Sequence, residues 1–156
     1  MANQFSLPFK DLLAGYKQLR QRLPRQVAII AAGHFKDNFR RQGILENGTL
    51  VAWQPRKLQR YKQRGQTGKK SSRLKLTAAG KHGRQRALLI ESGRMRRALQ
   101  PGADGDYAVV RNDTPYAGYH NEGTDTMPAR PFMVTTPDLE NDIEEHFFNE
   151  IDKLWK

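Results

Sequence analysis

The first forty residues alternate apolar and polar positions with the period of an α-helix. Residues 8–22 contain one apolar series at this spacing: Phe9, Leu12, Leu13, Tyr16 and Leu19. Residues 25–42 contain a second, with one face made of Val27, Ile30, Ala31, His34, Phe35, Asn38 and Phe39. Pro24 lies between them, and proline inside a helix removes a hydrogen bond and clashes with the preceding turn. The pattern predicts two N-terminal helices, with Gly43 as the residue that ends the second.

Short apolar runs between turn residues replace the helical pattern from residue 87 onward. Residues 87–112 hold strand-like runs separated by a Gly/Asp-rich turn, which predicts a β-hairpin. Residues 132–136 (FMVTT) are short and β-prone. Pro137 then opens a last helix, whose buried stripe consists of Leu139, Ile143, Phe147, Ile151 and Leu154.

These elements together predict an α+β fold. It has two N-terminal helices, a small antiparallel β-sheet with a long basic loop, and a C-terminal helix packed on the sheet. The 156 residues suit one domain with its own core, so we expect residues 1–156 to form a single unit.

The long basic loop is expected over residues 54–86. This stretch contains 12 Lys/Arg, no Asp/Glu and few apolar residues, so it buries little surface and is predicted to be flexible. Its candidate contacts with a polyanion or an acidic partner are Arg56, Lys57, Arg60, Lys62, Arg64, Lys69, Lys70, Arg73 and Lys75.

Charge divides the chain into two unlike parts. Residues 1–100 carry 23 Lys/Arg and four Asp/Glu, whereas residues 101–156 carry four Lys/Arg and 12 Asp/Glu. The resulting +19 and −8 indicate an acidic or polyanionic partner for the first part, or head-to-tail attraction between copies. A solvated surface with uneven charge is the simpler alternative.

Composition limits the kinds of site and the cellular locations that we expect for the protein. The chain has no cysteine, which excludes disulfides and thiolate metal sites. Its first residues do not resemble a signal peptide, and no apolar run approaches the roughly 20 residues of a membrane span. We therefore expect a soluble protein without membrane contact, and an intracellular setting fits.

No catalytic motif is visible in the sequence. The four histidines (His34, His82, His120 and His146) lack the spacing of a metal site, and GxSxG, GxGxxG and phosphate-binding loops are absent. His120 with Glu122, or with Asp113 or Asp125, is the one candidate acid/base pair, and such coincidences are common in polar segments. We expect no enzyme, cofactor or metal, and we expect His34 to be a core residue.

Residues 115–132 (PYAGYHNEGTDTMPARPF) concentrate side chains that constrain a backbone. Pro131 favours an extended conformation at Arg130, and the planar guanidinium of Arg130 can bind several carbonyls or a carboxylate. Tyr116, Tyr119 and Phe132 can bury their rings. The composition favours a rigid connector between the hairpin and the last helix over a catalytic loop.

The ordered set HFKDNFRRQG, WQP, ESGRMRRAL, YAGYHNEGT and MPARPFM, followed by a helix, resembles the phage virion morphogenesis or tail-completion family. The match runs from about residue 31 to the C-terminus, and PARPF is its most specific part. The matching residues are Gly43, Trp53, Ser92, Gly93, Tyr116, Ala117, His120, Gly123, Pro128, Arg130, Pro131 and Phe132. Ser92 stands where threonine is commoner, and the basic stretch is unusually long.

This resemblance implies a structural protein of phage or prophage virions that acts in tail completion or head–tail joining. It implies a ring-forming homo-oligomer, phage neck or tail proteins as partners, and a location in the virion after assembly in the bacterial cytoplasm. The alternative is a non-specific DNA-binding protein that uses the basic loop. Tyr61 is the only aromatic residue in that loop, so the sequence offers no stacking surface for bases.

Overall fold

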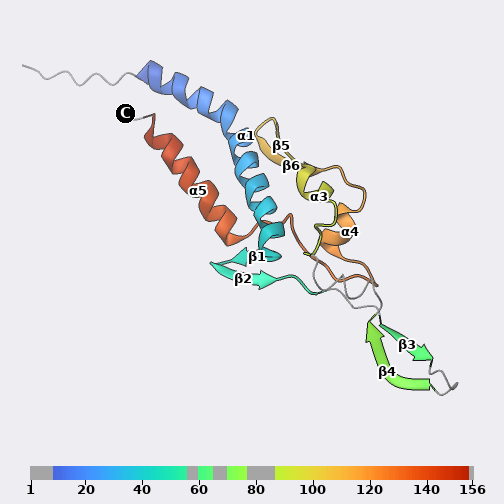
Figure 1. Cartoon of the computed structure of the whole chain (residues 1–156). Coiled ribbons are helices and arrows are strands. Elements are labelled where there is room, and N and C mark those ends of the chain that lie inside the picture. Colours follow the sequence, from blue (N-terminus) through green and yellow to red (C-terminus); the bar gives the residue numbers. More distant parts are fainter. Residues whose placement is uncertain (1–8, 56–59, 65–69, 77–86, 155–156) are drawn as a thin grey trace, which may run out of the picture.

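The computed structural model describes residues 9–55, 60–64, 70–76 and 87–154, and it has an α+β fold, as predicted (Figure 1). One long helix, α1 (Phe9–Arg41), lies at its centre. The prediction of two N-terminal helices is wrong, because α1 continues through Pro24 without interruption.

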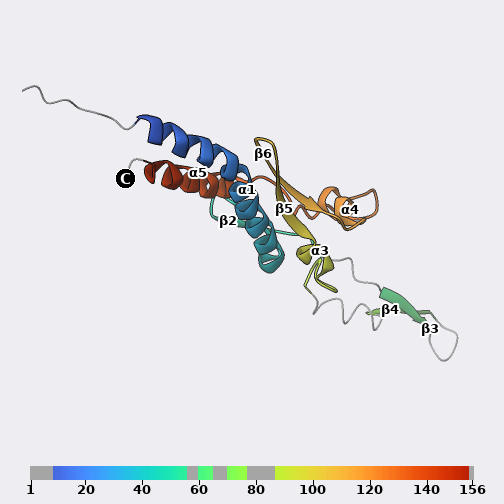
Figure 2. The same ribbon diagram turned by 90° about the horizontal axis from the view of Figure 1, so that it is seen from above.

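The surroundings of Pro24 explain why the helix continues. A proline inside a helix costs about 3 kcal/mol, so packing on both sides has to offset it. Pro24 is itself buried, and the residues before it are held from two directions. Arg20 pairs with Asp106, and Arg22 pairs with Glu150 at 2.7 Å. The two halves of α1 run in different directions in both views, which is the bend expected of a proline-containing helix (Figures 1 and 2).

A short hairpin follows α1. Strands β1 (Gly43–Glu46) and β2 (Thr49–Ala52) pair antiparallel around Asn47 and Gly48, whose φ angles are 51° and 73°. A two-residue turn with positive φ at both positions matches the right-handed twist of a hairpin, and Asn-Gly is its preferred sequence. We did not predict this hairpin, although its turn sequence is a strong signal.

The end of α1 differs in detail from the prediction. The left-handed residue that ends the helix is Gln42, with φ 59°, and not Gly43. Gly43 is required for another reason: a Cβ atom there would lie 2.3 Å from the carbonyl oxygen of Val51 on the paired strand.

The second hairpin consists of β5 (Leu99–Asp104) and β6 (Tyr107–Asn112), which confirms a hairpin around the Gly/Asp-rich turn. The prediction is wrong for residues 87–98, which form no strand and include the short helix α3 (Arg94–Arg97). Both strands pack against α1. The Arg20–Asp106 pair joins the helix to the turn of this hairpin, and the hydrogen bond from Arg20 lowers the pKa of Asp106 and raises that of Arg20. Both side chains are exposed, so the pair orients the turn more than it stabilises the fold.

A third antiparallel pair lies within the stretch predicted to be a basic loop. Strands β3 (Arg60–Arg64) and β4 (Lys70–Leu76) form it, with Tyr61 opposite Lys75. The loop prediction is therefore wrong over these two ranges. Both views draw this hairpin apart from the helices and from the other two hairpins (Figures 1 and 2). The remainder of the expected flexible loop, apart from residues 54–55, lies outside the described residues.

The C-terminal helix α5 (Pro137–Asp152) begins where predicted. We expected it on a sheet, but it lies beside α1 and reaches β1 only near its first turn. There the amide of Gly48 donates a 2.8 Å hydrogen bond to Asp138. Further along, a Cβ atom at Gly15 would lie 2.9 Å from the Leu154 side chain, so the missing side chain allows the helices to approach closely.

Glu150 is the buried polar contact between these two helices. Its carboxylate accepts hydrogen bonds from Lys153 at 2.5 Å and from Arg22 at 2.7 Å. The hydrogen bond from Lys153 contributes most to lowering the pKa of Glu150, with the charges of Lys153 and Arg22 acting in the same direction and burial opposing them.

The core lies where α1, the β5–β6 hairpin and the start of α5 meet. Its buried members are Ala31, Phe35, Phe39, Trp53, Met95, Leu99, Ala117, Phe132 and Leu139. Phe39 and Phe132 pack at its centre, with ring centroids 5.0 Å apart and both rings fully buried. Residues 132–136, predicted as a strand, form no strand: their place beside Phe39 is set by packing, not by β-pairing.

Candidate functional site

The residues of the family-like pattern come together at the C-terminal end of α1. They come from the residue after β2, from the turn before the short helix α3 (Arg94–Arg97), and from the segment that contains α4 (Ala117–Glu122) and leads to α5. We call the contacts among Trp53, Asn121, Arg130, Pro131 and Phe132 the connector junction.

Trp53 attaches the connector to the end of β2. Its indole Nε1 donates a 2.8 Å hydrogen bond to the carbonyl oxygen of Pro131, and its amide donates to the carbonyl of Gln42. Its ring lies edge-on to Phe39 at 5.8 Å between centroids. One side chain therefore joins α1, β2 and the connector, which explains the tryptophan in this pattern.

Arg130 is the buried cation of the junction, with only 5% of its surface exposed. Its Nε donates a 3.0 Å hydrogen bond to the carbonyl oxygen of Gln54, and its backbone amide donates to the carbonyl of His120 at 2.8 Å. The side chain thus crosses from the connector to the residue after Trp53. The guanidinium was predicted to bind backbone carbonyls or a carboxylate, and the bond to Gln54 is one such carbonyl contact.

Two asparagines also hold the connector in place, and neither was predicted to be a site residue. Asn121 accepts hydrogen bonds from the amides of Phe132 and Met133, both at 3.0 Å. Asn38 donates to the carbonyl of Phe132 at 3.2 Å and is fully buried. An asparagine on the apolar face of a helix was the available signal, because a buried amide needs a hydrogen-bonding partner.

Gly123 turns the chain sharply after α4. Its φ is 82°, and a Cβ atom there would lie 2.7 Å from the amide nitrogen of Ala129. Thr124 and Met127 then form a small β-bridge that returns the chain toward Pro128 and Arg130. Only glycine fits this position, both in backbone conformation and in space.

Gly93 has a related role in the turn before α3. Its φ is 69°, and its carbonyl accepts a 3.1 Å hydrogen bond from the amide of Arg97. The side chain of Asn112 then donates to the carbonyl of Met95 at 2.7 Å, which ties α3 to the end of β6. Gly93 therefore supplies the left-handed backbone conformation and the carbonyl oxygen with which α3 begins.

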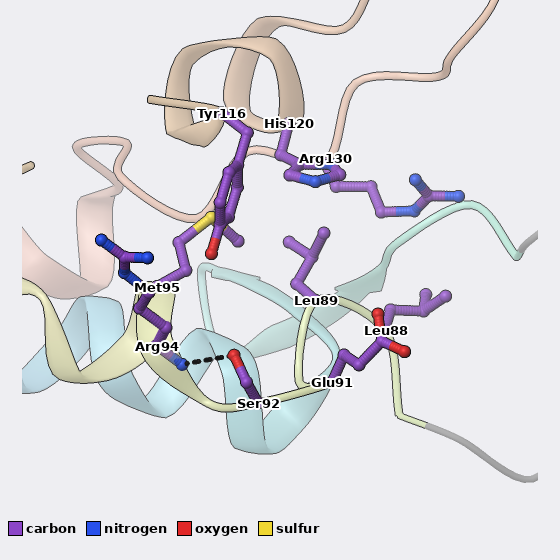
Figure 3. Close-up of a pocket in the computed structure, with 9 residues that line it drawn as sticks. All are labelled: Leu88, Leu89, Glu91, Ser92, Arg94, Met95, Tyr116, His120 and Arg130. Atoms are coloured by element: carbon purple, nitrogen blue, oxygen red, sulfur yellow. Dashed lines mark hydrogen bonds between the residues drawn. The ribbon is translucent and has the colours of Figure 1, made fainter. Parts of the chain in front are cut away.

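A cavity of about 500 Å³ lies beside the junction (Figure 3). Its lining is Leu88, Leu89, Glu91, Ser92, Arg94, Met95, Tyr116, His120 and Arg130. In Figure 3, Tyr116 extends along it beside His120, and the two rings meet edge-on at 6.0 Å. The Ser92 hydroxyl accepts a 3.3 Å hydrogen bond from the amide of Arg94, so this hydroxyl acts within the turn that starts α3.

One of the candidate acid/base pairs, His120 with Glu122, lies on the short helix α4. His120 and Glu122 are two residues apart on α4, and such positions on a helix do not face each other. His34 is a buried residue, as predicted, with Nε2 3.3 Å from the Thr136 hydroxyl and Nδ1 3.8 Å from Asp142. Within the described ranges, no group of three or more His, Cys, Asp or Glu is placed to hold a metal ion.

The candidate basic residues are divided between described and undescribed positions. Arg60, Lys62 and Arg64 are in β3, and Lys70, Arg73 and Lys75 are in β4. Arg56, Lys57 and Lys69 lie outside the described residues. The hairpin therefore gathers six of the nine positions on two paired strands.

Comparisons with protein families, with curated proteins and with solved structures found no match. The part of the chain that the structure describes contains no helix long and apolar enough to cross a membrane.

Proposed function

We propose that this chain is a structural protein of phage virion morphogenesis, which acts in tail completion or head–tail joining as a ring-forming subunit. The supporting observation is the connector junction. Residues of the family-like pattern that lie more than 70 positions apart, such as Trp53 and Pro131, are hydrogen-bonded to each other. The pattern therefore has a physical purpose in holding one fold.

The chemistry of these residues supports a scaffold over an enzyme. Trp53 and Arg130 both bind backbone carbonyl oxygens and are buried. A residue whose donors are directed at its own backbone stabilises a conformation. In this proposal the partners are neck or tail proteins and further copies of the chain, in a virion assembled in the bacterial cytoplasm.

The test is genetic complementation in the phage or prophage that encodes the chain. Deleting the gene should leave heads and tails that fail to join or complete, seen by electron microscopy, and the wild-type chain should restore infectious particles. Normal particles from the deletion strain would refute the proposal.

Non-specific DNA binding is the second candidate, and the β3–β4 hairpin favours it. Residues 54–86 carry 12 basic residues and no acid, and the paired strands bring six of the candidate bases together. A gel-shift assay with duplex DNA at physiological salt tests it. Binding that weakens steeply with salt and is lost when Lys62, Lys70 and Lys75 become glutamate would support it. No shift at low salt would exclude it.

A further inference from the structure

Helix α5 has an exposed face that its own fold does not use. Phe148 is 61% exposed, and the neighbouring positions at helical spacing, Glu144, Glu145 and Asp152, are exposed acids. The opposite face carries the buried Leu139 and Glu150. Within the described part of the chain, no ion pair involves these three acids. The outward face thus presents one aromatic ring with negative charge on both sides of it.

Helix α1 has an exposed stripe whose charged residues are all basic. Arg25, Ile29, Gly33, Lys36 and Arg40 follow one another at helical spacing, and all are exposed. Ile29 is 53% exposed, and the space where a Cβ atom of Gly33 would lie has no neighbour within 4 Å among the described residues. The stripe therefore has an apolar, open centre with positive charge at both ends.

A groove continues the stripe toward α3. It encloses about 670 Å³, and its lining is Gly33, Lys36, Asp37, Arg40, Arg96 and Arg97. Four of these six residues are basic. Arg40 bonds to Asp37 at 3.0 Å, so these two charges offset each other. The positive charges of Lys36, Arg96 and Arg97 remain, and the groove is therefore basic.

Acidic and aromatic residues along the exposed face of α5 follow one another in the same order as basic and apolar residues along the exposed stripe of α1. If α5 of one copy lies antiparallel to α1 of another, Phe148 can pack between Ile29 and Gly33. Because both helices rise 1.5 Å per residue, Glu144 and Glu145 then lie nearest Lys36, with Arg40 about 8 Å further along α1, and Asp152 lies near Arg25. A side chain opposite glycine also permits the close helix approach of 8–10 Å that helix packing requires.

We infer that α5 of one copy docks onto the α1–α3 surface of a second copy. In both views α5 and α3 lie on opposite sides of α1 (Figures 1 and 2). One chain therefore presents a patch on one side and its complement on the other. Contacts of this heterologous kind produce rings or filaments. The inference rests on the ring-forming part of the proposed function and names the surfaces that perform it.

The experiment measures self-association by sedimentation at low and high salt. An acid-reversed variant carries Glu144→Lys, Glu145→Lys and Asp152→Lys, and a base-reversed variant carries Arg25→Glu, Lys36→Glu and Arg40→Glu. Each alone should associate at least about tenfold more weakly than wild type, because like charges then face each other. An equimolar mixture of the two should regain association, since each supplies the surface that the other needs. High salt should weaken the wild-type and mixed assemblies.

Two controls separate the interface from net charge and from folding. Asp104→Lys, Asp113→Lys and Asp125→Lys together change the net charge as the acid-reversed variant does, but on exposed positions outside the interface, and should leave association unchanged. Phe148→Ser should weaken association without lowering the melting temperature, because the ring is largely exposed.

The outcomes distinguish this inference from the proposed function. If wild type associates and both reversed variants associate equally well, the interface is wrong and the ring-forming proposal stands. A wild type that stays monomeric at low salt, or a mixture that fails to associate, overturns the docking inference, and complementation then decides the virion role separately. A base-reversed variant that loses only DNA binding would assign the groove to nucleic acid and contradict a second copy as its occupant.

Discussion

The indole nitrogen of Trp53 donates a 2.8 Å hydrogen bond to the carbonyl oxygen of Pro131, which lies 78 positions further along the chain. The bond joins the residue after β2 to the connector before α5, so a single side chain fixes these two segments to each other. The same tryptophan ring packs edge-on against Phe39.

Trp53→Phe separates these two roles. The smaller phenyl ring keeps part of the packing against Phe39, but the hydrogen bond to Pro131 is lost and its half-buried carbonyl is left without that donor. We expect the free energy of unfolding to fall by about 1–2 kcal/mol, measured by chemical denaturation. Tyr107→Phe, at a 77% exposed position, is the control and should be neutral. Equal stability of both variants and wild type would show that the indole donor does not matter.

Gly123→Ala tests the turn after α4. The alanine needs φ 82° and brings its Cβ to 2.7 Å from the Ala129 amide, so both strain and a clash destabilise it. Gly105→Ala is the comparison, because Gly105 has φ 57° and open space around it within the described residues, whereas Gly123 has φ 82° and ψ −178°, a region that only glycine adopts readily. Left-handed strain alone costs about 1–2 kcal/mol. Thermal melting should show a clearly larger loss for Gly123→Ala, and equal losses would contradict both the clash and the additional backbone strain at Gly123.

Stability should decline in acid partly through Glu150. Its hydrogen bonds from Lys153 and Arg22 hold its pKa below the ordinary value in the folded protein. A carboxyl with a lowered folded pKa contributes stability above its unfolded pKa, near 4.3, and loses that contribution as the pH falls through the folded value. Glu150→Gln should therefore narrow the difference in melting temperature between neutral and acidic pH. Glu46→Gln, at an exposed strand position, should not. Identical pH profiles for wild type and Glu150→Gln would contradict the pairing.

His120→Gln with Glu122→Gln tests the expectation that the chain is not an enzyme. In a purely structural role these side chains take part in no chemical step, so particle yield in the complementation assay should fall only as far as the free energy of unfolding falls. A folded, assembling double variant that has lost a catalytic turnover of the wild-type protein would reverse the interpretation.

Local signals in the sequence predicted much of the fold. Pro137 and the acidic residues that follow it in the chain indicated the start of α5, and the Gly/Asp-rich turn indicated the β5–β6 hairpin. The helix through Pro24 was mispredicted because its continuation depends on packing against β5, β6 and α5, which lie far along the chain and include the buried partner of Arg22, Glu150. Local propensity carries no information about such contacts.

The sequence predicted the type of contact at the connector junction but not the residues that make it. The sequence indicated that Arg130 binds backbone carbonyls or a carboxylate, but not that Gln54 supplies a carbonyl. The role of Asn121 was missed, because an amide that bonds to distant backbone looks like any other polar residue in the sequence. Two local signals were overlooked: the Asn47-Gly48 turn, and the position of Asn38 on the apolar face of a helix.

Arg130→Lys tests most directly the claim that the connector is held by its own side chains. Lysine keeps the positive charge but loses the planar guanidinium that reaches the Gln54 carbonyl at 3.0 Å. We expect chemical denaturation to show a free energy of unfolding lower by about 1.5–3 kcal/mol, the usual loss for a hydrogen bond from a charged group. Unchanged stability in both Arg130→Lys and Arg130→Ala would contradict the account, because Arg130 would then not hold the connector.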